Sequence, residues 1–95
     1  MITTDASWRM LITKEMKYHK ETWEDVVYCT LSNTQLDIMF NYGFSEKWTE
    51  GAPFTLWTHQ RVYFPVGFDG YESVASAPRF PSNEAMRHVE GGDGF

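Results

Sequence analysis

Any chemistry in this chain would have to come from a few scattered nucleophiles and metal-ligating side chains. The histidines, His19, His59 and His88, lie far apart in the sequence, and the single cysteine, Cys29, lies in an apolar run. Metal sites and nucleophilic pairs that a sequence reveals have close, repeated spacing of such residues. We therefore expect surface histidines and a buried thiol, with no metal site, no cofactor and no catalytic residue.

Two other patterns are compatible with catalysis in principle. Asp69 and Glu72 lie close together, and paired carboxylates do acid–base chemistry when their environments separate their pKa values. Asp69 precedes Gly70, however, and aspartate is common there because turns favour it. The glycine-rich end at 91–94 has neither the lysine nor the following helix of a phosphate-binding loop. We predict that the protein is not an enzyme.

The rings around residues 54–72 indicate a contact surface instead. Aromatic residues make up 17% of the chain, and each buried ring removes roughly 150–250 Å² from water, so a few rings close a small core. If one sheet face is core, the other displays Trp57 and Tyr63 beside Arg61, with Phe68 at the tip of a turn. These residue types dominate interface hot spots. The alternative, that the N-terminal strand or the tail covers this second face, is equally compatible with the sequence.

The charge distribution favours a basic partner. The chain carries 13 acidic and 8 basic residues, a net charge of −5. Residues 21–58 hold six carboxylates and one lysine, and therefore a net −5. An acidic chain repels phosphate, so we expect no direct nucleic-acid binding, although exposed rings can stack bases. The carboxylates that we expect to contact a partner are Glu21, Glu24, Asp25 and Asp37; the alternative is a solvated acidic surface that aids solubility.

The helices and strands that must position these residues begin with the segment 7–20. Residues 7–13 alternate Trp8, Met10 and Ile12 on one side, which predicts a strand. The basic segment 14–20 is expected to be a connection or a short helix.

The segment 22–31 fits both a helix stripe and a strand alternation. Thr22 followed by Asp25 is compatible with an N-cap and an acid in the first turn. We favour the helix slightly, while the β-branched residues favour the strand.

A helix over about 33–42 is the clearest expectation. Ser32 and Gln35 fit a capping box, and an apolar face follows at spacings of three and four. Gly43 can supply the left-handed residue that ends the helix.

Three strands are predicted next, at about 54–58, 61–66 and 71–77, joined by a tight hairpin and by a glycine-containing turn at 67–70. The predicted fold class is α+β: a small antiparallel meander of three to four strands with one or two short helices on one face. We expect a single domain over 1–80 and a flexible tail over 81–95.

Length and composition indicate how many domains the protein has and in which compartment it is expected. With 95 residues, one domain is the expected count. A single cysteine forms no intrachain disulfide, which favours a reducing compartment. The N-terminus lacks the apolar run of a signal peptide, and no stretch approaches the roughly 20 apolar residues of a membrane span. We expect a cytoplasmic protein with no membrane association.

A family resemblance covers most of the chain, about 25–92. It is carried by the runs DVVYCTLS, QLD, FNYGF, GAPFTLWT, RVYFPV, FDGYE, SAPR and HVEGG. These resemble a family of small proteins from phages and mobile elements of proteobacteria, for which no catalytic residues are assigned. The resemblance implies a phage-type origin. Small acidic phage proteins, such as anti-CRISPR proteins, often inhibit a host complex by binding it.

We therefore expect a non-catalytic inhibitor that binds a nucleic-acid-binding bacterial defence complex, such as a CRISPR effector, in the host cytoplasm. Its acidic residues would engage the lysines and arginines that normally hold nucleic acid, and its rings would anchor the contact. The alternative function is a homodimeric structural or regulatory module.

Overall fold

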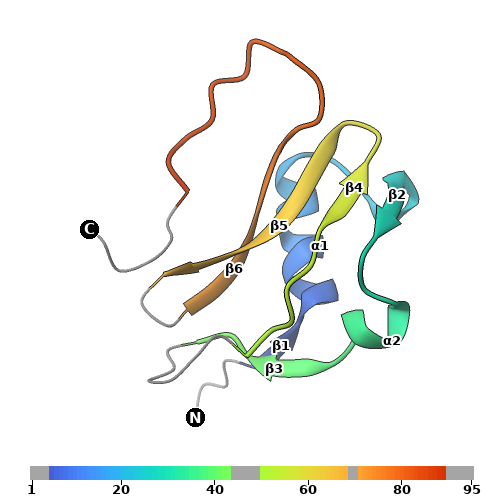
Figure 1. The fold of residues 1–95 in the computed structure, drawn as a ribbon, viewed down its shortest axis with the longest axis vertical. Coiled ribbons are helices and arrows are strands. Elements are labelled where there is room, and N and C mark those ends of the chain that lie inside the picture. Colours follow the sequence, from blue (N-terminus) through green and yellow to red (C-terminus); the bar gives the residue numbers. More distant parts are fainter. Residues whose placement is uncertain (1–4, 44–49, 69–70, 90–95) are drawn as a thin grey trace.

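The computed structural model describes residues 5–43, 50–68 and 71–89, and it confirms the α+β class (Figure 1). Within these residues there are two antiparallel sheets, one pairing β1 with β3 and one with the strand order β2-β4-β5-β6. The elements, in chain order, are β1 (Asp5–Ser7), α1 (Trp8–Tyr18), the 3₁₀ turn η1 (Trp23–Asp25), β2 (Val26–Cys29), α2 (Asn33–Leu36), β3 (Met39–Asn41), β4 (Leu56–Thr58), β5 (Arg61–Phe68) and β6 (Tyr71–Pro78).

The first helix corrects the strand predicted for 7–13. The Ser7 hydroxyl accepts a hydrogen bond from the Met10 amide at 3.2 Å and thereby caps α1. Trp8, Ile12 and Met16 are buried at a spacing of four, whereas Met10 is 54% exposed. The helical stripe of the longer segment, rather than the short alternation, thus decides the structure. The helix continues to Tyr18 and so includes most of the segment expected to be a connection or a short helix.

The helix favoured for 22–31 is also wrong, because only one 3₁₀ turn forms before the chain enters β2. The predicted cap is confirmed: the Asp25 carboxylate accepts from the Thr22 amide at 2.8 Å. Val26 and Val27 then follow in an extended strand, as β-branched residues favour. The strand alternative therefore describes Val26–Cys29 correctly.

The helix expected over 33–42 is confirmed at its start and wrong in its length. The capping box forms, with the Ser32 amide donating to Gln35 Oε1 at 2.8 Å and the Gln35 amide donating to Ser32 Oγ at 3.1 Å. The helix ends at Leu36, and β3 begins at Met39. Pairing of β3 with β1, which is distant in sequence, overrides the local helix signal. Gly43 therefore does not end this helix.

The three predicted C-terminal strands are confirmed as β4, β5 and β6, with a tight hairpin at 59–60. Part of the predicted second turn, 69–70, lies outside the described residues. Leu56 pairs with Tyr63, and Tyr63 pairs with Ser76, so these three side chains share one face of the sheet. Residues 79–89 form neither helix nor strand, and Figure 1 shows them leaving the top of the sheet and turning back beside it.

The four-stranded sheet has two different faces. Its inner face packs on α1, and the core there consists of Trp8, Ile12, Met16, Leu36, Phe54, Leu56, Tyr63 and Val74. Complete burial of an aliphatic side chain such as Ile12 or Leu56 contributes roughly 1.5–3 kcal/mol to folding. In Figure 1, α1 lies behind the strands, and no helix of the described part lies on the opposite, outer face.

A close contact at Gly51 ties the middle of the chain to α1 and β6. The Trp8 indole donates to the Ala52 carbonyl at 2.9 Å, and the buried Glu72 carboxylate accepts from the amides of Glu50 and Gly51 at 2.9 and 3.0 Å. A Cβ atom at Gly51 would lie 2.5 Å from the Trp8 ring. Only glycine therefore fits here without displacing its neighbours.

Candidate functional site

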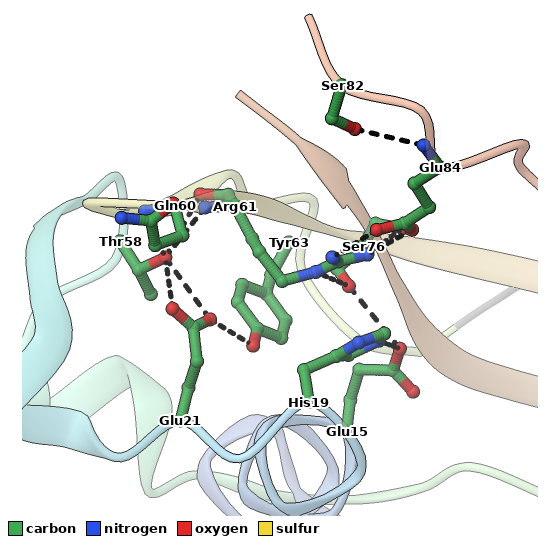
Figure 2. Close-up of polar contacts among 10 residues, drawn as sticks. All are labelled: Glu15, His19, Glu21, Thr58, Gln60, Arg61, Tyr63, Ser76, Ser82 and Glu84. Atoms are coloured by element: carbon green, nitrogen blue, oxygen red, sulfur yellow. Dashed lines mark hydrogen bonds and ion pairs between the residues drawn. The ribbon is translucent and has the colours of Figure 1, made fainter. Parts of the chain in front are cut away.

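A group of polar side chains lies on the inner face of the sheet, beside the apolar core (Figure 2). Arg61 and Tyr63 are alternate residues of β5 and therefore point to the same face. Lys20 has a left-handed backbone, with φ of 59°, so that the chain reverses after α1 and the Glu21 amide donates to the Met16 carbonyl at 2.8 Å. This reversal aims Glu21 at the sheet. The polar cluster is defined as Glu15, His19, Glu21, Thr58, Arg61, Tyr63, Ser76 and Glu84.

One half of the polar cluster is centred on Glu21. Its carboxylate accepts a hydrogen bond from the Tyr63 hydroxyl at 2.5 Å and one from the Thr58 hydroxyl at 2.9 Å. Tyr63 is fully buried. Burial first, and then the carboxylate of Glu21, raise the pKa of Tyr63 above its ordinary value, so that Tyr63 stays a protonated donor.

The other half is centred on Arg61, which is 9% exposed. Its Nε donates to Ser76 Oγ at 2.9 Å. Its Nη1 and Nη2 donate to the two carboxylate oxygens of Glu84 at 3.0 and 3.1 Å, in a bidentate pair. The hydrogen bonds to Glu84 raise the pKa of Arg61, and the same bonds lower the pKa of Glu84.

Glu15 and His19 connect α1 to this arrangement. His19 Nε2 lies 2.8 Å from Glu15 Oε2, one helical turn away, and that oxygen also accepts from Ser76 Oγ at 3.4 Å. The His19 ring meets the Tyr63 ring edge-on at 6.5 Å. The histidine is thus bonded to a carboxylate rather than to the Ser76 hydroxyl, so the geometry is not that of a serine nucleophile and its base.

The polar cluster is saturated with hydrogen bonds. Among the described residues, no buried side-chain nitrogen or oxygen lacks a partner. What this arrangement offers chemically is a fixed guanidinium that recognises a carboxylate with two parallel bonds.

Two cavities border the polar cluster. One, of about 500 Å³, runs along β6 between Tyr18 of α1 and residues 84–89. The other, of about 450 Å³, lies between the α1 end and residues 78–84. Arg61, His19 and Glu84 line both cavities. Their volumes are within the range of small-molecule sites.

The structure changes the interpretation of the predicted aromatic and arginine anchors. Trp57 lies on the outer face, partly exposed, but Tyr63 and Arg61 are buried on the inner face. The prediction that these two are exposed beside Trp57 is therefore wrong, because the β4–β5 register aligns Trp57 with Val62 and Leu56 with Tyr63. Phe68 ends β5, and its side chain lies outside the described residues.

The predicted acidic contacts are dispersed, and most have intramolecular partners. Glu21 belongs to the polar cluster, and Asp25 caps η1. Asp37 forms an ion pair with Arg9 at 2.6 Å. Glu24 is exposed on η1. The structure thus leaves Glu24 as the carboxylate of this set that is most open to a partner.

The outer face of the sheet carries an apolar surface. Cross-strand pairing aligns one row over all four strands: Tyr28, Trp57, Val62 and Ala77. The Tyr28 and Trp57 rings lie 5.8 Å apart. Phe64 and Ala75 form the next pair. The outer patch is defined as Tyr28, Trp57, Val62, Phe64, Ala75 and Ala77; it carries no charged residue, and every member is at least partly exposed.

Tyr28 was not among the predicted contact residues, because segment 22–31 was favoured as a helix. The signal was the strand alternation of the same segment, which places Tyr28 opposite Cys29. Cys29 is a free, half-buried thiol that packs against the core.

The described residues contain no group of three or more His, Cys, Asp and Glu residues placed to hold a metal ion. None of their helices has the length and apolar character needed to cross a membrane.

Comparisons of the chain with protein-family models, with curated proteins and with solved structures found no match. The resemblance to small phage proteins therefore stays a prediction.

Proposed function

We propose that the protein is a non-catalytic binding protein that uses the outer patch to dock on another protein. The observation that carries this proposal is the row Tyr28–Trp57–Val62–Ala77, an uncharged stripe across four strands that stays partly exposed. Buried sheet faces exclude water, and an apolar face that is left partly exposed is typical of an interaction surface. Trp and Tyr, which occupy its β4 and β2 positions, are among the side chains that most often anchor interfaces.

The partner that we propose is a bacterial defence complex that binds nucleic acid, such as a CRISPR effector, and the protein would act as its stoichiometric inhibitor. The net charge of −5 supports a basic partner surface. Glu24, four residues before Tyr28 in the chain, is exposed and can supply a charged contact to the partner. The buried Arg61 and Tyr63 have no part in this contact.

The test is capture followed by a functional assay. The tagged protein is incubated with a lysate of bacteria that carry defence complexes, and the captured complex is then purified and mixed with its nucleic acid. The proposal predicts a stoichiometric partner whose nucleic-acid binding falls as the protein is added. A partner that keeps its nucleic-acid affinity would contradict the inhibitor function.

The second candidate is a homodimer, because an apolar sheet face can also pack on a copy of itself. Native mass spectrometry separates the two candidates. A monomer that becomes a heteromeric complex supports the inhibitor, and a tight dimer that captures no other protein supports the structural or regulatory module.

A further inference from the structure

The contact between Arg61 and Glu84 joins a buried side chain of β5 to an exposed segment that has neither helix nor strand. Arg61 lies in β5, with its side chain 10% exposed, and it is held by two further hydrogen bonds, from Nε to Ser76 Oγ and from Nη2 to the Ser76 carbonyl. Glu84 lies in a segment without helix or strand, where residues 79–89 are all exposed. Its side chain is 40% exposed.

The guanidinium half of this pair therefore has the properties of a preformed receptor. Ser76 fixes the orientation of Arg61, so that little side-chain freedom is left to lose when a carboxylate binds. A buried guanidinium without an anion is costly, so the site requires an occupant. Glu84 supplies that occupant from the same chain, at the high effective concentration of a tethered group.

The space around the pair fits more than a single carboxylate. Arg61 and Glu84 both line the cavity of about 500 Å³, whose walls along β5 and β6 include Val66, Val74 and Ala75. A ligand that places its carboxylate on Arg61 would thus lay an apolar group along β6.

We propose that Arg61 and Ser76 form a binding site for a carboxylate attached to an apolar group, and that Glu84 is its exchangeable internal occupant. The ligand displaces Glu84, and the segment around Glu84 loses its ion pair with β5, while Arg79 keeps its hydrogen bonds to Thr58 and Gln60. This site shares Ala75 with the outer patch, but it is centred on the inner-face Arg61 and does not depend on the function proposed for the patch.

The test uses the full-length chain with Glu84→Gln, which keeps the size of the side chain and removes its charge. Glu84 is at the surface, so the variant is expected to fold; the matched control is Glu24→Gln, the same change at an exposed carboxylate on η1. The probes are a fluorescent, C-terminally amidated peptide with the sequence of residues 80–89, the same amidated peptide with glutamine in place of its glutamate, and hexanoate. Anisotropy measures peptide binding, and the Arg61 Nε–Hε NMR signal locates the bound carboxylate for every probe.

We expect the glutamate peptide to bind Glu84→Gln at least about tenfold more tightly than it binds the wild type or Glu24→Gln, because an internal occupant present in nine of ten molecules lowers apparent affinity by that factor. The Arg61 signal should shift and saturate, and the glutamine peptide should cause no shift. Saturable shifts with hexanoate would support free carboxylic acids as ligands, and shifts with the peptide alone would support an acidic segment of a protein. If no carboxylate probe shifts Arg61 in Glu84→Gln, or if the wild type binds equally well, the proposal is wrong.

Discussion

Tyr63 and Arg61 belong to residue types that are common at protein interfaces, but in this protein both are buried and stabilise the fold. Both carry a polar tip on a long side chain, and each tip finds hydrogen-bond partners on the inner face. Tyr63 fills the core with its ring and gives its hydroxyl to Glu21, while Arg61 gives its guanidinium to Ser76 and Glu84. Tyrosine and arginine are equally compatible with an interface hot spot and with a buried position whose polar atoms are hydrogen-bonded, so residue type alone does not distinguish the two.

Replacing Tyr63 by phenylalanine tests the Glu21 half of the polar cluster. The variant leaves Glu21 with one fewer donor, so we expect the free energy of unfolding at pH 7 to fall by about 1–3 kcal/mol. Tyr18→Phe is the matched control, because Tyr18 is 76% exposed; it should change stability little. A Tyr63→Phe protein as stable as the wild type would show that the hydroxyl contributes nothing.

The raised pKa of Tyr63 also predicts that the free energy of unfolding falls at alkaline pH. The folded state holds this proton more tightly than the unfolded state, whose tyrosine pKa is about 10. The stabilisation is fully present below pH about 10 and is lost as the pH rises further. In urea titrations, the stability difference between wild type and Tyr63→Phe should therefore narrow above pH about 10; a constant difference would contradict the raised pKa.

The ion pair of Glu84 predicts a loss of stability at acid pH. Its pKa is lowered by Arg61, so its contribution is present above the unfolded value of about 4.3 and is lost as the pH falls through the folded pKa. The stability difference between wild type and Glu84→Gln should be positive at pH 7 and smaller at pH 3. A stability difference of the same size at pH 7 and pH 3 would argue against the ion pair.

At the scale of the elements, local signals predicted the C-terminal half well and the N-terminal half poorly. Alternation and turn residues identify β4, β5 and β6, because a hairpin forms from neighbours in the sequence. The N-cap at Thr22 and the capping box at Ser32 were also predicted, since they too are local. The lengths of the helices were not, because β2 and β3 pair with strands that are distant in the sequence.

The candidate site was less predictable than the fold. Trp57 was correctly expected on the face opposite Leu56, but which face of β5 joins it depends on the register of one hairpin. A shift of one residue exchanges every side chain between the two faces. The pairing of Glu84 with Arg61 could not be predicted, since the segment after β6 carries no periodic pattern that places it.

The close contact of Gly51 with α1 and β6 predicts that a larger residue at this position destabilises the protein. Gly51→Ala places a methyl group within 2.5 Å of the Trp8 ring and 2.9 Å of the Glu72 carboxylate. We expect a loss of about 1–3 kcal/mol in unfolding free energy, as for other overpacked positions. The exposed neighbour provides the control, Ala52→Ser, which should be close to neutral. Thermal denaturation that is unchanged in Gly51→Ala would contradict the tight packing of α1 on residues 50–52.

At the scale of the whole molecule, the sheet separates two kinds of surface. Its inner face combines the apolar core with a saturated polar cluster, and its outer face is uncharged and partly exposed. The acidic residues expected to form one contact surface are instead distributed between a cap, an ion pair and the polar cluster. The contact that we propose therefore relies on the rings of the outer patch, with charge in a supporting role.

The measurement that tests this account most directly is the affinity of the captured partner for two matched variants. Trp57→Ser removes the ring at the centre of the outer patch, and Phe80→Ser removes a 60% exposed ring that lies outside the sheet. Biolayer interferometry should show binding weakened by at least about 30-fold for Trp57→Ser, the loss of a hot spot of about 2 kcal/mol, and unchanged for Phe80→Ser. Wild-type affinity in a folded Trp57→Ser protein would contradict the assignment of the outer patch as the binding surface.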